Sequence, residues 1–394
     1  MEFSFVKHEL ISVGTILILG LLGGWSAKKI KLPHISGYFL IGFLTGPHVL
    51  GLLTTETIQN THIIIDIALG FILYSIGGQF DFFNIRAQKK IIYLGLIQSL
   101  FSLVIMYFFV QLFNVSWSLS LLIASIGISS SPAIVLLVIK DFKADGPMTQ
   151  ATLMTVAVNN VISFLIFSLV LSTVHVQQAQ SIFLVLGHPI YVIVGSLFLG
   201  STIGYVMAFI ERYLQEEEMF LLISGGLMMA VGLALTLHLS PLFVALIIGS
   251  VTRSIIRSQK FHVVDIAPMT KIFYIALFVY SGAELNPTFL PKMGMIGIAF
   301  ILARAFGIIG GVWCGAHILK LSPMIRKYSG LATIPLAGMA IGLTETTMRY
   351  YPEIGHQLNV VIFSAIFVFE TIGPLMTEYA IFKAGEAEKN PLQD

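Results

Sequence analysis

The sequence predicts an all-helical membrane protein in which about thirteen transmembrane helices form two inverted six-helix repeats with crossed, broken helices. Three observations support this fold class: the apolar composition, the placement of the basic residues, and matching interruptions in two of the expected helices. Of the 394 residues, 56% are hydrophobic and 11% are charged, and the mean hydropathy is +0.91. Because a soluble domain carries about 25% charged residues, this composition excludes an ordinary soluble globule.

Composition also limits the chemistry. The formal net charge of +2 supplies no strong basic field, so no nucleic-acid partner is expected. Cys314 is the single cysteine in the sequence and cannot form an internal disulfide. The sequence contains no phosphate-binding loop, nucleophile elbow, pair of catalytic carboxylates or histidine spacing suited to a metal. We therefore expect no enzymatic activity, no cofactor and no metal site.

Apolar stretches of about 20 residues, the length that crosses a hydrocarbon core of about 30 Å, mark the expected spans. They lie near residues 10–27, 35–53, 62–78, 91–113, 117–139, 150–173, 188–210, 218–237, 240–256, 270–285, 293–319, 328–347 and 358–382. The linkers between them are too short for a folded soluble domain. Residues 1–382 are therefore expected to form one transmembrane transporter domain, followed by a short cytoplasmic tail at 383–394.

The basic residues test this topology, because cytoplasmic loops retain Lys and Arg whereas translocated loops lack them. With the N-terminus outside, eighteen of the 22 basic residues fall on the inner side. Lys7, Lys292 and Arg349 fall outside, and Arg304 lies within a span. A cleaved signal peptide over residues 1–27 would leave the first basic cluster outside, against this pattern. We expect a multi-pass protein of the cell (inner) membrane with a cytoplasmic C-terminus.

Three short patterns recur along the chain at a nearly constant spacing. Residues 36–39 recur at 240–243, residues 73–81 at 279–286, and residues 131–133 at 334–336. The shared spacing predicts one repeat at about 10–173 and a second at about 218–382, joined by a linking span at 188–210. Because this span intervenes, the second repeat enters the membrane from the opposite side, which is an arrangement that alternating access exploits.

Two expected spans contain helix-breaking residues at matching places of the repeats. Pro132 follows three serines in the fifth span, and Pro335 and Gly338 interrupt the twelfth. A proline removes a backbone donor, so we expect both helices to break near the middle of the membrane and to cross. A pair of ordinary proline kinks is the alternative. At a crossing, freed carbonyls and helix ends can hold an ion, and the candidate ion-binding side chains there are Ser130, Ser131 and Thr333.

Polar groups inside spans are functional candidates, since a charge at the bilayer centre costs about 3 kcal/mol or more unless it is paired or solvated. Asn159 and Asn160 are neighbours in the sixth span, and their side chains point about 100° apart. One can face the crossing, although interhelical hydrogen bonds worth about 1 kcal/mol are the alternative. Arg304, midway along the eleventh span, needs a buried acceptor, a water-filled cavity or an anionic ligand.

Three acidic residues are candidates for charge compensation or coupling. Asp66 lies about one turn below the outer surface, and Glu370 lies near the middle of the thirteenth span. Either could neutralise Arg304, although Asp66 is equally well explained as a solvated residue near the interface. Glu345, close to the outer end of the broken twelfth span, is a weaker candidate.

Several motifs together resemble the membrane domain of the monovalent cation:proton antiporter superfamily, in the branch of bacterial Na+/H+ antiporters and glutathione-gated K+ efflux systems. The resemblance covers nearly the whole chain. It implies a thirteen-span inverted-repeat fold, a crossed pair of broken helices and a homodimer. The motifs that carry it are Leu32–Gly42, Gly46-Pro47, Leu50-Gly51, Ala68–Gly77, Ser129–Ala133 and Gly373-Pro374.

The chain departs from the family pattern at one important place. Members capable of antiport usually have Asp-Asp or Asn-Asp where this chain has Asn159-Asn160, and the second carboxylate binds cation and proton in competition. Asn160 has no titratable proton, whereas its amide oxygen can still coordinate a cation weakly. Arg304 corresponds to the basic residue that members hold near the acidic pair. Without its usual partner, it is expected to make the site more positive.

These observations favour a secondary-active antiporter that exchanges a monovalent cation, Na+ or K+, for protons by alternating access. Its partners would be the cation, the proton, the lipid bilayer and a second copy of the chain. Coupling would then depend on Glu370 or Asp66. Two alternatives remain: an uncoupled or anion-handling carrier, in which Arg304 and the amides of Asn159 and Asn160 hold a small anion, and a non-transporting membrane subunit.

Overall fold

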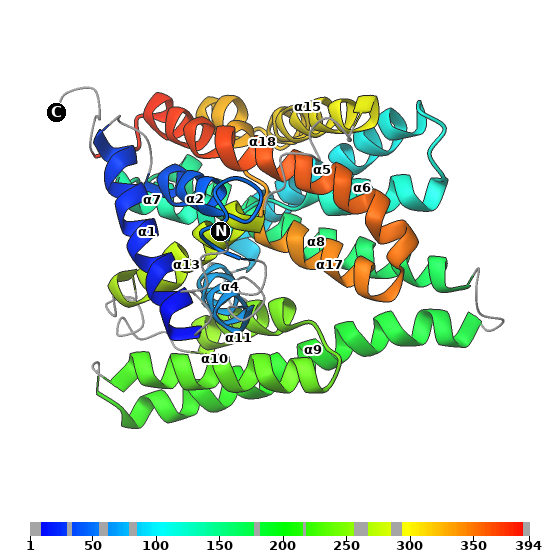
Figure 1. Ribbon diagram of the computed structural model, residues 1–394. Coiled ribbons are helices and arrows are strands. Elements are labelled where there is room, and N and C mark those ends of the chain that lie inside the picture. The colour runs from blue at the N-terminus through cyan, green and yellow to red at the C-terminus, as the bar shows by residue number, and fades with distance from the viewer. Residues whose placement is uncertain are drawn as a thin grey trace. The chain divides into compact units, whose positions relative to one another are not determined.

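The computed structural model describes residues 9–29, 34–54, 62–78, 85–176, 182–215, 218–255, 267–284 and 294–388. Within these ranges every regular element is a helix (Figure 1), which confirms the all-helical fold class. Eight described stretches are long and apolar enough to cross a membrane, and three shorter apolar helices accompany them. They coincide with apolar stretches that the sequence marked as spans.

The chain divides into two compact units, each of which draws on both halves of the sequence. Unit 1 comprises Met1–Ala87 and Ile190–Leu285, and unit 2 comprises Gln88–Pro189 and Asn286–Asp394. All the residues that the sequence predicted at the helix crossing belong to unit 2, whereas Asp66 belongs to unit 1.

Unit 1 is built from helices that pack through small residues. Gly77, the last residue of α4 (His62–Gly77), lies against the backbone of Leu246, and Gly249 lies against the backbone of Tyr74. Neither position therefore has room for a side chain. Its helices are α1 (Glu9–Lys29), α2 (His34–Thr45), α4 (His62–Gly77), α9 (Ile182–Ile210, from Ile190 onward), η3 (Glu211–Tyr213), α10 (Met219–Thr236), α11 (Pro241–Ile255) and α13 (Ala267–Glu284).

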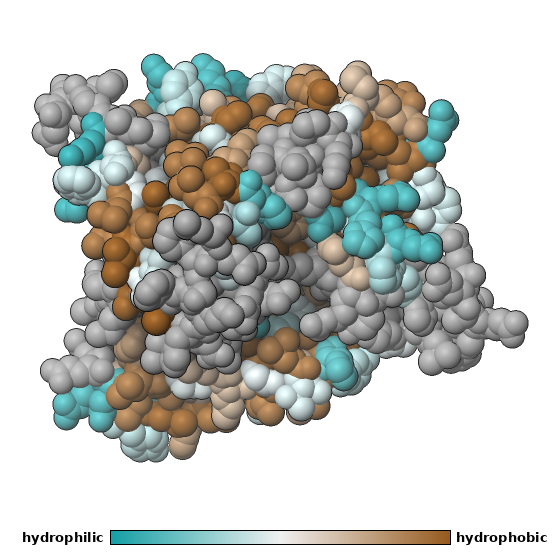
Figure 2. All heavy atoms as spheres, viewed as in Figure 1, coloured by the Kyte–Doolittle hydropathy of each residue, from teal (hydrophilic) through white to brown (hydrophobic). Residues whose placement is uncertain are grey.

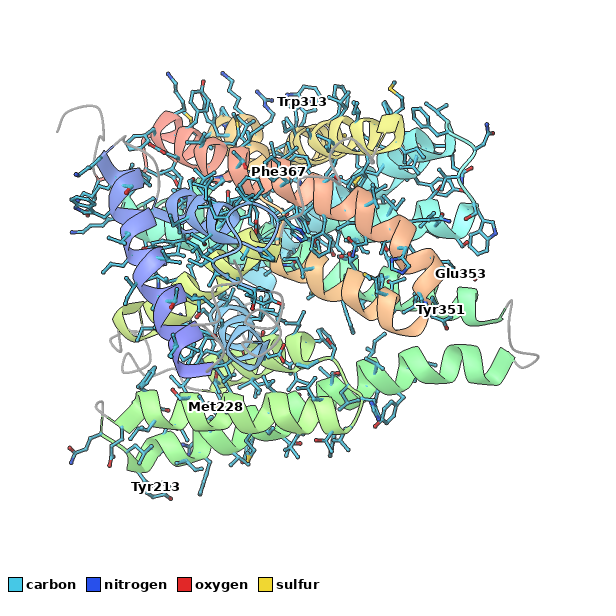
Figure 3. All side chains as sticks on the ribbon, viewed as in Figure 1. Tyr213, Met228, Trp313, Tyr351, Glu353 and Phe367 are labelled. Carbon is cyan, nitrogen blue, oxygen red and sulfur yellow. The ribbon has the colours of Figure 1, made fainter. Side chains whose placement is uncertain are left out.

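Unit 2 contains both interrupted helices. The chain turns back between α17 (Gly338–Tyr350) and α18 (Pro352–Ala384), next to the labelled Tyr351 and Glu353 (Figure 3). The helices of unit 2 are α5 (Ile85–Gln111, from Gln88 onward), α6 (Trp117–Ile128), α7 (Pro132–Asp141), α8 (Pro147–Val176), α15 (Gly294–Ile318), the π-helix η5 (Ile325–Ser329), α16 (Gly330–Ala332), α17 (Gly338–Tyr350) and α18 (Pro352–Ala384).

Large apolar side chains are exposed on both units. Met228 of α10 and Trp313 of α15 (Figure 3) are 45% and 54% exposed, respectively. Figure 2 shows apolar residues over much of the visible face. Water would not favour such surfaces, whereas lipid tails would. The exposed surface is thus that of an integral membrane protein.

Both predicted helix breaks are present. α6 ends at Ile128 and α7 begins at Pro132, with three non-helical residues between them. α16 ends at Ala332 and α17 begins at Gly338. An ordinary proline kink keeps the helix continuous on both sides, so the kink alternative does not describe these two helices.

The described residues after α18 pack against the loop that precedes α8. Gly385 ends α18 in the left-handed conformation, with φ of 72°. The carboxylate of Glu386 then accepts hydrogen bonds from the backbone N–H groups of Met148 (2.8 Å) and Thr149 (2.7 Å). A carboxylate at this position caps the N-terminus of α8, the helix that carries the two asparagines.

We predict that Glu386→Ala lowers the stability of the protein, because two N–H groups of the first turn of α8 lose their acceptor. The expected loss is about 1–2 kcal/mol, measured as a lower midpoint of thermal unfolding in detergent. Glu388→Ala is the matched control, since Glu388 is 68% exposed and its ion pair with Lys143 spans 3.8 Å. Equal midpoints for the two variants would contradict the capping role.

Candidate functional site

The two interrupted helices of unit 2 meet directly. The backbone N–H of Ser131 donates to the carbonyl of Pro335 at 2.7 Å. Both residues lie in the non-helical segments, and the segments are buried. The ends of four half-helices therefore gather at one place, with partial positive charge at the N-terminal ends and partial negative charge at the C-terminal ends.

Arg304 holds the two non-helical segments together. It is fully buried, and its guanidinium donates through Nε to Gly127 O (2.9 Å) and through Nη2 to Ser129 O (2.7 Å). Through Nη1 it donates to Ile334 O in the other segment (2.6 Å). The buried acceptor that the sequence analysis required for this arginine is thus a set of backbone carbonyls. Their partial negative charges offset part of its positive charge.

Aromatic contact completes the surroundings of Arg304. The ring of Phe369 in α18 lies 4.4 Å from Cζ of Arg304, which is a favourable cation–π distance. Phe369 directly precedes Glu370, whose side chain is 1% exposed. Glu370 is therefore the next residue in the chain after the aromatic contact of Arg304.

Asn160 recognises the backbone of Ser130. Its Oδ1 accepts from Ser130 N at 3.3 Å, and its Nδ2 donates to Ser130 O at 3.1 Å. A backbone N–H can only donate and a carbonyl can only accept, so the orientation of this amide is fixed. A carboxylate could make the first of these bonds but not the second. The amide thus satisfies both the backbone N–H and the backbone carbonyl of Ser130.

Asn159 binds the same serine from another side. Its Nδ2 donates to the hydroxyl of Ser130 at 3.3 Å, and its Oδ1 accepts from the hydroxyl of Ser99 in α5 at 3.0 Å. The bond to Ser99 is the interhelical hydrogen bond that the sequence analysis kept as an alternative. Asn159 therefore links α5, α8 and the break between α6 and α7.

Hydroxyl groups satisfy further carbonyls at the C-terminal ends of the half-helices, which would otherwise lack partners. Ser163 donates to Ser125 O at 2.7 Å, and Thr377 of α18 donates to Ala332 O at 3.2 Å. The sequence analysis missed Ser99, Ser163 and Thr377. Ser163 could have been found from the sequence, because it lies one helical turn after Asn159 and Asn160 and so shares a face of the helix with them.

The remaining predicted residues are placed as follows. Ser131 caps α7 by accepting from Ile134 N at 3.4 Å, and the hydroxyl of Thr333 donates to Gly330 O at 3.1 Å. Asp66 is partly buried in α4 of unit 1. Glu345 belongs to α17, but its side chain lies outside the described residues.

Comparison with known proteins gives relatives along nearly the full length of the chain. A K+/H+ antiporter subunit of Bacillus subtilis is 25% identical over 401 residues, covering 95% of this chain and 94% of the relative. A probable Na+/H+ antiporter of Methanocaldococcus jannaschii is 24% identical and covers 92% and 94%. An ammonium/H+ antiporter subunit of Alkalihalophilus pseudofirmus is 20% identical and covers 91% and 93%.

Solved structures of a sodium proton antiporter from Methanocaldococcus jannaschii share the fold. One, at pH 8, has a TM-score of 0.70 at 19% identity and covers 98% of this chain and 97% of that chain. A second, from electron microscopy, has a TM-score of 0.74 at 18% identity and covers 96% and 98%. The family model described as "Sodium/hydrogen exchanger, transmembrane" matches residues 15–379. The chain therefore belongs to the sodium/hydrogen exchanger family, within the monovalent cation:proton antiporter superfamily.

Proposed function

We propose that this protein is a secondary-active antiporter that exchanges a monovalent cation, Na+ or K+, for protons by alternating access. The observation that carries the proposal is the direct bond between Ser131 and Pro335, which joins two interrupted helices around the buried Arg304. Such crossings present carbonyls and helix ends in the middle of a membrane, where an ion can bind without its hydration shell. The relatives support it, since they are a K+/H+ antiporter subunit, a probable Na+/H+ antiporter and an ammonium/H+ antiporter subunit.

The cation would bind among the oxygens around Ser130. The proposed ligands are oxygens of Asn159, Asn160, Ser130, Ser131 and Thr333. The amide oxygens already accept one hydrogen bond each, from Ser99 and from Ser130 N. An amide oxygen has two lone pairs, so one acceptor position remains on each for a weakly held cation.

The finer topology belongs to the same proposal. We place thirteen spans in the inner membrane, with the N-terminus outside, the C-terminus in the cytoplasm and residues 383–394 as a cytoplasmic tail. The division of the chain supports two inverted repeats, because each unit takes its helices from both halves. Alternating access would consist of a displacement of unit 2, which carries the crossing, and the protein would work as a homodimer.

The anion-handling alternative gains no support from the described contacts. An anion would need donors directed at it, but three of the five N–H groups of Arg304 are directed at backbone carbonyls. The Nδ2 groups of both Asn159 and Asn160 donate to Ser130. These donors instead hold the backbone at the crossing.

Transport in liposomes tests the proposal. With purified protein and an imposed inside-acid gradient, we expect the addition of external Na+ or K+ to raise the lumenal pH, because each entering cation releases a proton. A lumenal pH dye follows the change, Li+ is tested in parallel, and protein-free liposomes are the control. If no cation raises the lumenal pH above that of the control, the antiporter proposal is wrong and anion flux is the next measurement.

A further inference from the structure

Buried charge in unit 2 is confined to two side chains among the described residues. These are Arg304 and Glu370, which are 0% and 1% exposed, respectively. Arg304 is permanently cationic and its recorded donors meet backbone carbonyls. Glu370 can carry a proton or a cation, and burial makes an uncompensated carboxylate costly. It therefore has the chemistry that Asn160 lacks.

The face of α18 that carries Glu370 is turned toward the break between α16 and α17. Glu370, Gly373 and Thr377 are spaced three and four residues apart, so they share one face of the helix. Thr377 donates to the carbonyl of Ala332 at 3.2 Å. A side chain at Gly373 would begin 2.9 Å from Pro335, so α18 lies directly against the non-helical segment there.

These two contacts give a direction along the face. Thr377 contacts Ala332, and Gly373, one turn nearer the N-terminus of α18, contacts Pro335. The two segments therefore run in opposite directions past each other. From these two contacts we infer that Glu370, one further turn along α18, faces the end of the non-helical segment, where α17 begins at Gly338. The residue preceding this helix is an alanine and provides no side-chain cap. The first N–H groups of α17 favour negative charge nearby.

Pro374 changes the backbone hydrogen bonding of α18 next to Glu370. It lies inside α18, four residues after Glu370, and has no N–H to donate to the Glu370 carbonyl. The carboxylate and the carbonyl of one residue are thus placed on a helix that contacts the break. Oxygen ligands of both kinds are those that bind alkali cations at broken helices in membranes.

We propose that Glu370 is the residue at which the cation and the proton compete. The inference rests on the proposed antiport, adds the Glu370 carboxylate to the ligands proposed around Ser130, and assigns the coupling step to α18 rather than to the asparagine pair of α8. On one side of the membrane, a cation M+ replaces the proton on Glu370, so that the O–H bond breaks, an M+–carboxylate contact forms and H+ leaves. On the other side the reverse step occurs. One titrating carboxylate exchanges one proton for one monovalent cation, and transport is electroneutral.

Other charged groups lie on the elements packed against α18, and Arg304 is the one that contacts α18 next to Glu370. Lys140 and Asp141 end α7, at the level where Phe142 contacts Phe382, three turns along α18 from Glu370. The side chains of Glu345 and Arg349 in α17 lie outside the described residues. The remaining charged or titratable groups with described side chains on these elements and on α18 are Cys314, His317, Arg326, Lys327, Tyr328, Glu353, His356, Glu378, Tyr379 and Lys383, and the side chains of His175 and Tyr350 lie outside the described residues.

Glu370→Gln tests the assignment, because glutamine keeps the shape of the side chain and removes the exchangeable proton. We expect cation-driven alkalinisation of liposomes to fall to the level of protein-free liposomes. Glu378→Gln is the matched control: it changes a partly buried acid two turns along the same helix and should transport like the unmodified protein. Normal transport by Glu370→Gln, beside an active unmodified protein, would overturn this inference and leave the proposed antiport intact.

Two further measurements keep the inference testable if Glu370→Gln fails to fold. Glu370→Asp retains a carboxylate one methylene shorter, and we expect active transport with a displaced pH profile. An unchanged profile would overturn the assignment. Electroneutral exchange also predicts that the transport rate of the unmodified protein is the same at clamped membrane potentials of either sign, and a dependence on potential would contradict it. If the unmodified protein transports no cation, the proposed function and this inference both fall.

Discussion

Arg304→Met is expected to destabilise the protein by about 3–5 kcal/mol, because three buried carbonyls would lose their hydrogen-bond donors. Methionine fills a similar space but donates no hydrogen bonds. The carbonyls of Gly127, Ser129 and Ile334 would lose the donors at 2.9, 2.7 and 2.6 Å. Unsatisfied buried carbonyls cost about 1–3 kcal/mol each, and the two non-helical segments would keep the Ser131–Pro335 bond but lose the link through the arginine. The midpoint of thermal unfolding in detergent measures the loss.

Arg304→Lys separates the role of the charge from the role of the planar donor group. Lysine keeps the positive charge but concentrates its donors at one nitrogen, so it cannot reach all three carbonyls in the same geometry. We expect an unfolding midpoint between those of Arg304→Met and the unmodified protein. If lysine restored full stability, charge alone would suffice and the bonds to both segments would not matter.

The breaks could be predicted from the sequence because their causes are local. Pro132 and Pro335 lack the N–H that a continuous helix requires, and this is visible without any knowledge of the fold. The crossing itself was predicted from the matching positions of the two prolines in the repeat, and the bond from Ser131 to Pro335 joins the two breaks. Local chemistry thus sufficed to predict the two breaks.

The partners of the polar groups could not be predicted in the same way, because they depend on packing between distant segments. Arg304 was expected to need a buried acceptor, a water-filled cavity or an anionic ligand, and sequence spacing does not reveal that carbonyls of α6 and of the second non-helical segment lie within its reach. The cap that Glu386 provides is 238 residues away from Met148 in the chain. Hydroxyls such as Thr377 are common in membrane helices, so their occurrence alone did not mark the site.

Asn160→Asp is expected to lower stability by about 1–3 kcal/mol, because the side chain would lose one of its two hydrogen bonds to the backbone of Ser130. The side chain of Asn160 both accepts from Ser130 N and donates to Ser130 O, at 3.3 and 3.1 Å. An ionised carboxylate keeps the first bond, loses the second and places a negative oxygen against the carbonyl. Thermal unfolding in detergent measures the effect.

Asn159→Asp is the matched control, because it adds the same buried charge one residue away. The Nδ2 of Asn159 donates to the hydroxyl of Ser130, and a hydroxyl can rotate to donate to a carboxylate instead. The carbonyl of Ser130 cannot change role in this way, so the difference between the two variants isolates the lost donor. We expect Asn160→Asp to be the less stable of the two. Equal stability would mean that the amide at position 160 is not needed to hold the break, and the site would then accept a carboxylate at either position.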